Sequence, residues 1–270
     1  MSQTANVIPL NGWELLMATA LVVAAGGISL LLRLGIERRL SVAAVRTVVQ
    51  LLLIGYVLRW VFALNHPGLI AAVIAVMLLA ASREGVRRPS RSFRGATGFA
   101  LTTLTASALT ITFIVTRLVI DVQPTWHEPR YLIPLLGMVL GNQLTGVSLC
   151  TDKLLSILAE RRHEIEMELA CGATRWEAAR EALRESVRTG MIPNINSMMV
   201  TGLVFLPGMM TGQILAGIDP VVAVRYQIMV MFMIAAATSL GCILMTLLTY
   251  RRMFNARHQL ESDRIRSQKS

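Results

Sequence analysis

Charged residues are scarce in this sequence of 270 residues, since Asp, Glu, Lys and Arg make up 16% of it while 54% is hydrophobic. A soluble domain of this length normally carries far more charge. The charges are also clustered, because long apolar runs alternate with short arginine-rich patches. This arrangement is typical of a polytopic membrane protein.

Cysteine is scarce as well. The three cysteines, Cys150, Cys171 and Cys242, show no pairing pattern, which argues against a disulfide framework or a zinc site. The four histidines fall in predicted loops or in the tail, so no Cys/His cluster indicates a high-affinity metal site. We expect the cysteines to be small buried hydrophobic side chains.

Several functional signatures are missing. A Gly-x-x-x-x-Gly-Lys-Ser/Thr phosphate loop does not occur, so the sequence predicts no ATP site of its own. Acidic residues do not occur in the middle of the apolar runs, where an ion-coupled carrier would want one: Glu14 and Asp219 lie at run ends and Asp152 at a boundary. Without a Ser/His or acidic metal pair inside the runs, an intramembrane enzyme is the weakest alternative.

Basic residues are missing from the first 13 positions, which argues against a cleaved signal peptide. The first apolar run is therefore expected to remain as a span with its N-terminus outside. Elsewhere the formal net charge is +10, but the arginines lie in alternate loops beside apolar runs. This distribution indicates membrane topology and not nucleic-acid binding.

Seven apolar runs are candidates for membrane-spanning helices, because about 20 residues rising about 1.5 Å each cross the apolar core of a bilayer. The runs are 13–32, 42–62, 68–82, 98–118, 132–150, 190–207 and 224–250. The third and sixth are short or interrupted, so they could be re-entrant. The fold class predicted is an all-α polytopic membrane protein with about seven transmembrane helices.

The basic residues predict the orientation of these spans. They concentrate at 33–39, at 83–94, at 153–188 and after 250, whereas the alternate loops hold only Arg117, Arg130 and Arg225. The arginine-rich loops are expected to face the cytoplasm, giving an N-terminus outside and a C-terminus inside. Residues 1–250 would form one transmembrane domain, with a cytoplasmic insert at 151–189, and residues 251–270 a polar, frayed cytoplasmic tail.

The cytoplasmic insert reads as a helical hairpin between spans five and six. A first helix at 154–170 would end at Gly172, the usual left-handed cap, and Thr174 with Glu177 would form a capping box for the second. Trp176 begins an apolar face at helical spacing in the second helix. The hairpin could dock a soluble partner or lie as an amphipathic pair on the membrane surface.

The insert resembles the cytoplasmic loop of ABC transporter permeases, with methionine and glutamate in place of the two alanines of that family's Glu-Ala-Ala stretch. The chain is most similar to one group of them, the FetB-like (UPF0014) family. The resemblance is carried by RTVVQLLLIGYVL at 46–58, GMVLGNQLTGVSL at 137–149, ELACGATRWEAAREALRESVRTGMIPNINSMMVTGLVFLPGMMTGQILAG at 168–217 and DPVVAVRYQIMVMFMI at 219–234.

This resemblance implies a multi-pass permease of the cell inner (plasma) membrane. It would act as a homodimer, with a separate ABC ATPase that binds ATP and Mg²⁺, and have no enzymatic activity or bound cofactor of its own. Bacterial members of the family export iron, while plant relatives are linked to aluminium tolerance and nucleotide-sugar transport, so a nucleotide-sugar or another organic solute is the alternative cargo. The residues expected to couple to the ATPase are Glu166, Glu168, Gly172, Ala173, Thr174, Trp176 and Glu177.

Polar groups inside the spans are candidates for a translocation pathway. Arg46 and Gln50 share a helix face, as a snorkelling anchor or as a gate facing the interior. Gly137, Gly141 and Gly146 form a small-residue packing face. Asn142, Thr145 and Ser148 lie on or near that face, as inter-helix hydrogen-bonding groups or as pathway lining.

The sixth run contains helix-breaking residues. Pro193 is expected near a helix start, where the backbone N–H that proline lacks would have no partner within the helix. Pro207 is expected to end the regular helix. The segment 206–218 would then be broken or re-entrant and face the protein interior. The remaining pathway candidates here are Asn194, Asn196, Ser197, Thr201, Met209, Met210 and Gln213.

Methionines crowd the sixth and seventh runs. Thioethers prefer soft ions such as Cu(I) over hard ferric iron, which makes them candidate ligands. The alternative, which we favour on sequence alone, is a deformable core at an interface that must repack. The moving element of the pathway is expected to be the sixth span, continuing directly from the hairpin.

Overall fold

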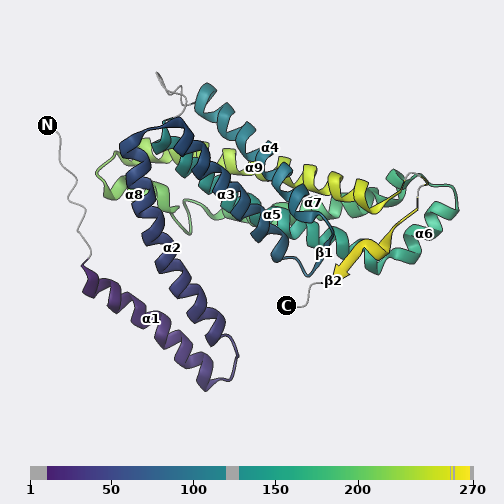
Figure 1. Ribbon diagram of the computed structural model, residues 1–270, viewed down its shortest axis with the longest axis horizontal. Helices are drawn as coiled ribbons and strands as arrows, with labels where there is room; N and C mark the ends of the chain where they lie inside the picture. Colours follow the sequence, from purple (N-terminus) through teal and green to yellow (C-terminus); the bar gives the residue numbers. More distant parts are fainter. Residues whose placement is uncertain (1–10, 120–127, 256, 258, 268–270) are drawn as a thin grey trace.

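The computed structural model describes residues 11–119, 128–255, 257 and 259–267. Their order along the chain is α1 (Gly12–Leu31), α2 (Glu37–Leu64), α3 (Pro67–Arg87), β1 (Arg91–Phe93), α4 (Ala96–Ile114) with a π-helical turn (Val115–Val119), α5 (Pro129–Glu160), α6 (Arg162–Ala170), α7 (Arg175–Val200), α8 (Gly208–Leu215), α9 (Pro220–Met253), a 3-10 turn (Ser262–Arg264) and β2 (Ile265–Ser267). The fold is a bundle of long helices with a two-stranded ribbon at one end (Figure 1).

Within the described residues, six helices are long and apolar enough to cross a membrane: α1, α2, α3, α4 with its π-helical turn, α5 and α9. The third expected span, short in the sequence, is part of a helix of 21 residues. The sixth corresponds to the C-terminal half of α7, whose N-terminal half is strongly charged, so this helix is not among the six. The chain is an all-α, multi-pass membrane protein, while the seventh span stays a prediction.

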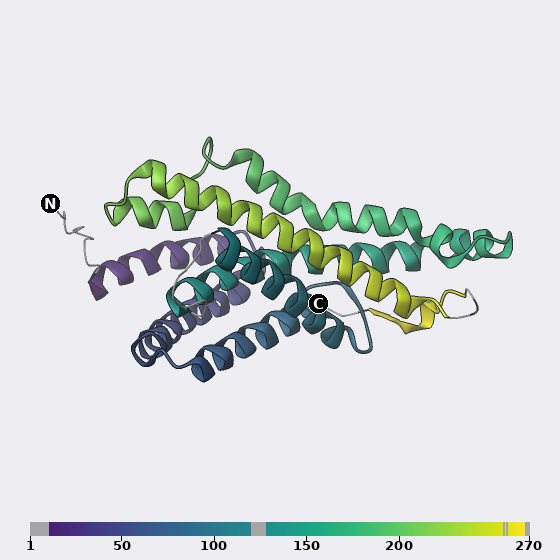
Figure 2. The same ribbon diagram turned by 90° about the horizontal axis from the view of Figure 1, so that it is seen from above.

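The core of the bundle is formed by α5, α7 and α9, which pack along one another, with α3 and α4 against them (Figure 2). Gln143 of α5 is fully buried there. Its Nε2 donates to the Ser107 hydroxyl of α4 and, at 3.0 Å, to the Ala237 carbonyl of α9. A single amide thus connects three helices in a region where no water competes for its hydrogen bonds.

The three core helices come closest at two glycines. A Cβ on Gly190 of α7 would lie 2.8 Å from the Gly146 carbonyl oxygen of α5 and 2.9 Å from Cys242 Sγ of α9. Of the small-residue face predicted on α5, only Gly146 makes such a backbone approach. A Cβ on Gly141 would meet nothing within 4 Å, and one on Gly137 would touch only a methionine methyl group.

The α1–α2 hairpin lies apart from the core. The two helices pack on each other, and α2 also touches α5, but only 6% of the apolar window of each is buried (Figures 1 and 2). These helices are stabilised by the bilayer or by another chain, because their apolar surface has little protein contact within this chain.

The described part of the tail, up to residue 267, is not frayed as expected. After α9 the chain turns back, Glu261 N donates to the Met253 carbonyl at 2.8 Å, and Phe254 and Leu260 are buried. Strand β2 then pairs antiparallel with β1, with Ser92 opposite Arg266. Apolar anchors at both sides of the turn explain why a polar segment stays attached to the bundle.

A disulfide can test this pairing. With Cys171 changed to Ser to remove the exposed thiol, the variant S92C/R266C is expected to cross-link under mild oxidation, since directly paired residues of antiparallel strands have Cβ atoms about 4.5–5.5 Å apart. Protease cleavage between the two positions followed by non-reducing gel electrophoresis detects the bond. The pair S92C/R257C is the control, and efficient cross-linking in both pairs would refute the register.

The segment after α3, the C-terminal part of α5 and the segment after α9 meet at one end of the bundle. Ser90 donates from its amide and its hydroxyl to Asp152 Oδ1, both at 2.7 Å, and Arg91 forms an ion pair of 3.2 Å with Glu160. Together with the β1–β2 pairing, these contacts place three of the arginine-rich segments on the same side. This agrees with the alternation on which the predicted orientation rests.

Candidate functional site

The hairpin of α6 and α7 ends in a short, well-defined turn. Gly172 has a φ of 97°, which favours glycine, and its amide donates to the Leu169 carbonyl at 3.1 Å. The predicted capping box is confirmed: the Thr174 hydroxyl accepts from Glu177 N, and Glu177 Oε2 accepts from Thr174 N at 2.7 Å. These bonds from Thr174 to the carboxylate lower the pKa of Glu177.

The first arm of the hairpin differs from the prediction of one helix at 154–170. Helix α5 runs unbroken from the bundle core to Glu160, and α6 begins separately at Arg162. Glu166 on α6 is held by Arg162 at 2.7 Å. Glu168 and Gly172 are exposed and Ala173 is half-buried, so the turn presents both side chains and backbone to a partner.

The second arm packs on the bundle through the predicted apolar face. Ala179 and Leu183 are buried, and the ring of Trp176 lies edge-on to Tyr250 of α9 with centroids 5.8 Å apart. On the opposite side Lys153 of α5 pairs with Glu185 of α7 at 2.7 Å and lowers the pKa of that carboxyl. The arm is thus attached to α5 and α9, not lying free on a membrane surface.

Helix α7 continues from this arm as a single helix of 26 residues to Val200. Pro193 therefore lies well inside the helix, not near its start as predicted, because the hairpin arm and the sixth apolar run are the same helix. A proline there removes one backbone hydrogen bond and favours a bend. Asn194, immediately after it, is buried.

The break after α7 begins earlier than predicted. The helix ends at Val200, the segment 201–207 is non-helical, and Pro207 is the N-cap of α8, not the end of the preceding helix. The expectation that residues 206–218 face the interior is wrong for the single chain, since Leu206 is 52% and Leu215 69% exposed and α8 has no buried residue. Phe205, Pro207, Gly208 and Met209 border one cavity, and Met210 borders an adjoining hollow.

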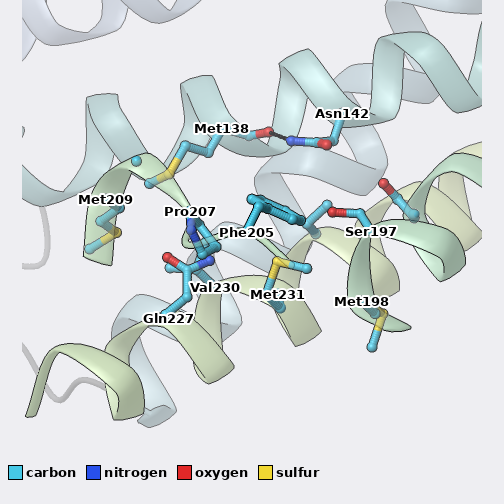
Figure 3. A pocket seen from close by; sticks show the side chains of 13 residues that line it. Met138, Asn142, Ser197, Met198, Phe205, Pro207, Met209, Gln227, Val230 and Met231 are labelled. Carbon is cyan, nitrogen blue, oxygen red and sulfur yellow. Dashed lines mark hydrogen bonds between the residues drawn. The ribbon is translucent and has the colours of Figure 1, made fainter. Parts of the chain in front are cut away.

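That cavity has a volume of about 220 Å³ and lies between α5, α7, α8 and α9 (Figure 3). Five of the predicted pathway residues line it: Asn142, Asn194, Ser197, Pro207 and Met209. The other lining residues are Met138, Met198, Phe205, Gly208, Gln227, Val230, Met231 and Ile234. None of the 13 is charged, so the cavity is neutral and largely apolar, and its polar and sulfur groups are amides, the Ser197 hydroxyl and thioethers.

Two amides of the cavity are buried with an unused polar atom. Gln227 Oε1 and Asn194 Nδ2 find no hydrogen-bond partner among the described residues, and the two residues are only 5% and 6% exposed. Leaving such a group unpaired costs about 1–3 kcal/mol. Asn142, by contrast, is turned to its own helix and donates to the Met138 carbonyl at 2.9 Å. The unpaired amides indicate a place where a ligand or water completes the structure.

A second hollow of about 420 Å³ adjoins the first and shares Met198, Gln227 and Met231 with it. It is also lined by two predicted residues, Thr201 and Met210. Together the two hollows follow the C-terminal turns of α7 on one side and the N-terminal half of α9 on the other.

The remaining pathway candidates lie elsewhere. Arg46 and Gln50 are exposed on α2, in a separate shallow surface hollow. Thr145 accepts from Arg88 Nη1 at 3.5 Å, and Asn196 is exposed on α7. Gln213 is partly buried on α8, with its Oε1 unpaired, but lines neither hollow.

Gln227 is the site residue that sequence reasoning missed. It is a buried amide in the apolar run of α9, a signal of the same kind that singled out Asn142 and Asn194. Met138 and Met231 could not be distinguished from other methionines, because only the fold brings them to one cavity.

The cysteine and histidine predictions hold in part. Cys150 and Cys242 are buried as expected, whereas Cys171 is exposed in the hairpin turn. His163 lies on α6 rather than in a loop, and His127 and His258 are outside the described residues. Among the described residues there is no group of three His, Cys, Asp or Glu side chains that could hold a metal ion.

The comparisons with known proteins agree with the sequence resemblance. Residues 12–254 match the model of the Uncharacterised protein family (UPF0014). The chain is 40% identical over 230 residues to the UPF0014 membrane protein slr1647 of Synechocystis sp. PCC 6803, covering 84% of this chain and 87% of that protein. It is 33% identical over 247 residues to the "Probable iron export permease protein FetB" of Escherichia coli, covering 92% and 93%.

Plant proteins are also similar. "Protein ALUMINUM SENSITIVE 3" of Arabidopsis thaliana is 29% identical over 229 residues, covering 85% of this chain and 82% of that protein. No solved structure matches the chain. A family match over nearly the whole length, with relatives named as membrane proteins and a permease, shows that this multi-pass membrane protein belongs to the UPF0014 family.

Proposed function

We propose that the chain is the membrane-spanning permease subunit of an ATP-driven exporter. The observation that carries this proposal is the continuity of α7, whose first turn forms the exposed hairpin and whose last turns line the cavity through Asn194, Ser197 and Met198. A helix is stiff along its axis, so a push at the turn is transmitted to the cavity wall. Pro193 lies between the two ends and offers a point of bending.

The motor is a separate ABC ATPase that binds the hairpin. The exposed turn at 171–174 is capped at both sides, and Glu168 and Glu177 lie beside it. A rigid, protruding element suits insertion into a groove of a partner better than a mobile loop does. The arginine-rich end that carries it faces the cytoplasm in this proposal, where ATP is available.

The functional unit is a homodimer. The non-helical segment 201–207 lies beside the apolar part of the bundle, with Leu203 and Val204 exposed. Irregular backbone at membrane depth is tolerated only where protein or water satisfies its polar groups. A second copy that covers this segment and the α1–α2 hairpin would enclose the irregular backbone of 201–207 and bury the exposed apolar surface of the hairpin.

The cargo class is a metal ion. The Escherichia coli relative is named a probable iron export permease, and that name supports metal export without fixing the metal for this chain. An organic solute such as a nucleotide-sugar is less suited to the cavity, because none of its lining residues is charged. The lining also lacks the Arg or Lys that would pair with phosphate.

Purification with the cognate ATPase tests the proposal. The tagged chain is expected to isolate as a complex of two permease and two ATPase subunits, and the complex in liposomes should hydrolyse ATP faster when the transported metal is present. The matched control is the ATPase with a substituted catalytic carboxylate. If no ATPase binds and ATP has no effect on metal flux, the chain is an ion-coupled carrier or channel and the proposal fails.

A further inference from the structure

The cavity between α5, α7, α8 and α9 has a composition that selects among metal ions. Four of its 13 lining residues are methionines, one from each of four helices: Met138, Met198, Met209 and Met231. Figure 3 shows Met138, Met209 and Met231 around Pro207 and the Gln227 amide, with Met198 at the other end. Methionines from separate helices that surround one hollow form a set of sulfur donors.

The charge of the lining argues against hard cations. Among the described residues that border the cavity there is no Asp or Glu, and His and Cys are absent as well. Hard ions such as Fe³⁺ or Al³⁺ need anionic oxygen ligands, and their charge is strongly disfavoured in a neutral apolar site. A monovalent ion carries the smallest desolvation penalty of any metal ion in such surroundings.

The thioethers favour a particular kind of monovalent ion. Thioether sulfur is a soft, neutral donor that selects Cu(I) among biological metals and binds alkali ions poorly. Gln227 lines the same cavity, and its Oε1 is a neutral oxygen that is buried and has no hydrogen-bond partner in the described structure. A buried carbonyl oxygen that lacks a hydrogen-bond donor can instead coordinate a cation.

We propose that this cavity binds a soft monovalent cation of the Cu(I) type. The thioether sulfurs of Met138, Met209 and Met231 are its ligands, and the Gln227 amide oxygen lies beside them. The inference names the cargo class of the proposed exporter and rests on that function only for the cavity's role in transport, since binding itself needs no ATPase.

Thioether ligation can be observed directly on the full-length chain. Selenomethionine-labelled protein, purified in detergent without oxygen and loaded with one equivalent of Cu(I), is expected to show selenium neighbours in the Cu absorption-edge fine structure. This readout distinguishes thioether ligation from binding by Cys150, Cys171 or Cys242. A Cu(I) shell that contains sulfur and no selenium would overturn the proposal.

Affinity gives the second measurement, by competition with a chromophoric Cu(I) chelator. In a background of C150A/C171S/C242A, which removes thiolate binding, the variant M138L/M209L/M231L is expected to lose more than about 100-fold in affinity, because even an outer-shell partner contributes roughly 10- to 100-fold. Leucine keeps the shape and apolarity of the lining. The matched control M17L/M167L/M199L removes three exposed thioethers and should change affinity by less than about twofold.

The outcomes separate this inference from the proposed function. Equal affinities in the two triple variants would overturn the inference; if the cysteine-free background does not fold, the selenium measurement decides. Absent Cu–Se contacts in a complex whose ATPase remains coupled would refute the soft-ion site and leave the exporter standing. Cu–Se contacts in a chain that binds no ATPase would support the soft-ion site and refute the proposed exporter. Tight binding of Fe³⁺ that is lost in M138L/M209L/M231L would also overturn the soft-ion assignment.

Discussion

Replacing Gly190 with leucine is expected to prevent the chain from forming a stable bundle, and replacement with alanine should lower its stability by about 1–3 kcal/mol, the usual range for overpacking. The new Cβ would lie 2.8 Å from the Gly146 carbonyl oxygen and 2.9 Å from both Cys150 Cβ and Cys242 Sγ. One of these contacts is backbone, which cannot rotate away as a side chain can. The thermal melting temperature in detergent and the yield of monodisperse protein measure the effect.

Gly141 provides the matched control. It lies in the same bundle, on α5, but a Cβ there would meet nothing within 4 Å. Gly141→Ala should therefore melt at the temperature of the parent chain or slightly above it, because alanine favours the helix over glycine by roughly 0.8–1.0 kcal/mol. If Gly190→Ala and Gly141→Ala melt together, the close crossing of α5, α7 and α9 is not present in the molecule.

The largest functional effect is expected from Gly172→Pro, which should abolish coupling of ATP hydrolysis to transport while leaving the membrane insertion of the chain intact. Proline holds φ near about −65°, whereas Gly172 has a φ of 97°, and proline also removes the amide that donates to the Leu169 carbonyl. The turn between α6 and α7 would be rebuilt. ATPase binding and metal flux in liposomes are the measurements.

An equivalent substitution elsewhere separates a local defect from a coupling defect. Gly35, in the turn between α1 and α2, also has a positive φ, of 70°, so Gly35→Pro imposes the same kind of strain outside the hairpin. It should disturb the α1–α2 turn but leave ATPase binding unchanged. Normal flux per ATP hydrolysed in the Gly172→Pro variant would contradict the docking role of the hairpin.

The long helices could be predicted because each is formed by one continuous apolar run of the sequence. Apolar runs of span length form helices wherever a bilayer must be crossed, and α1, α2, α4 and α9 lie within a few residues of their predicted bounds. The capping box of Thr174 and Glu177 was predictable too, since its two members are three residues apart. That the sixth run continues from the hairpin was also predicted, but not that both belong to one helix with Pro193 inside it.

Features that depend on distant partners were not predicted. The approach of Gly190 to Gly146, the three-helix bond of Gln143 and the pairing of Ser92 with Arg266 join residues far apart in the chain, and no local pattern marks them. The position of the break was misjudged because Pro207 can either end one helix or begin the next. In the structure Pro207 begins α8, and α7 already ends at Val200.

The pairing of β1 with β2 has a consequence for how the protein is made. Strand β1 precedes α4, whereas its partner Ile265–Ser267 follows α9. The ribbon can therefore close only after all the described membrane helices have been synthesised. A chain truncated before residue 265 would lack this end of the molecule.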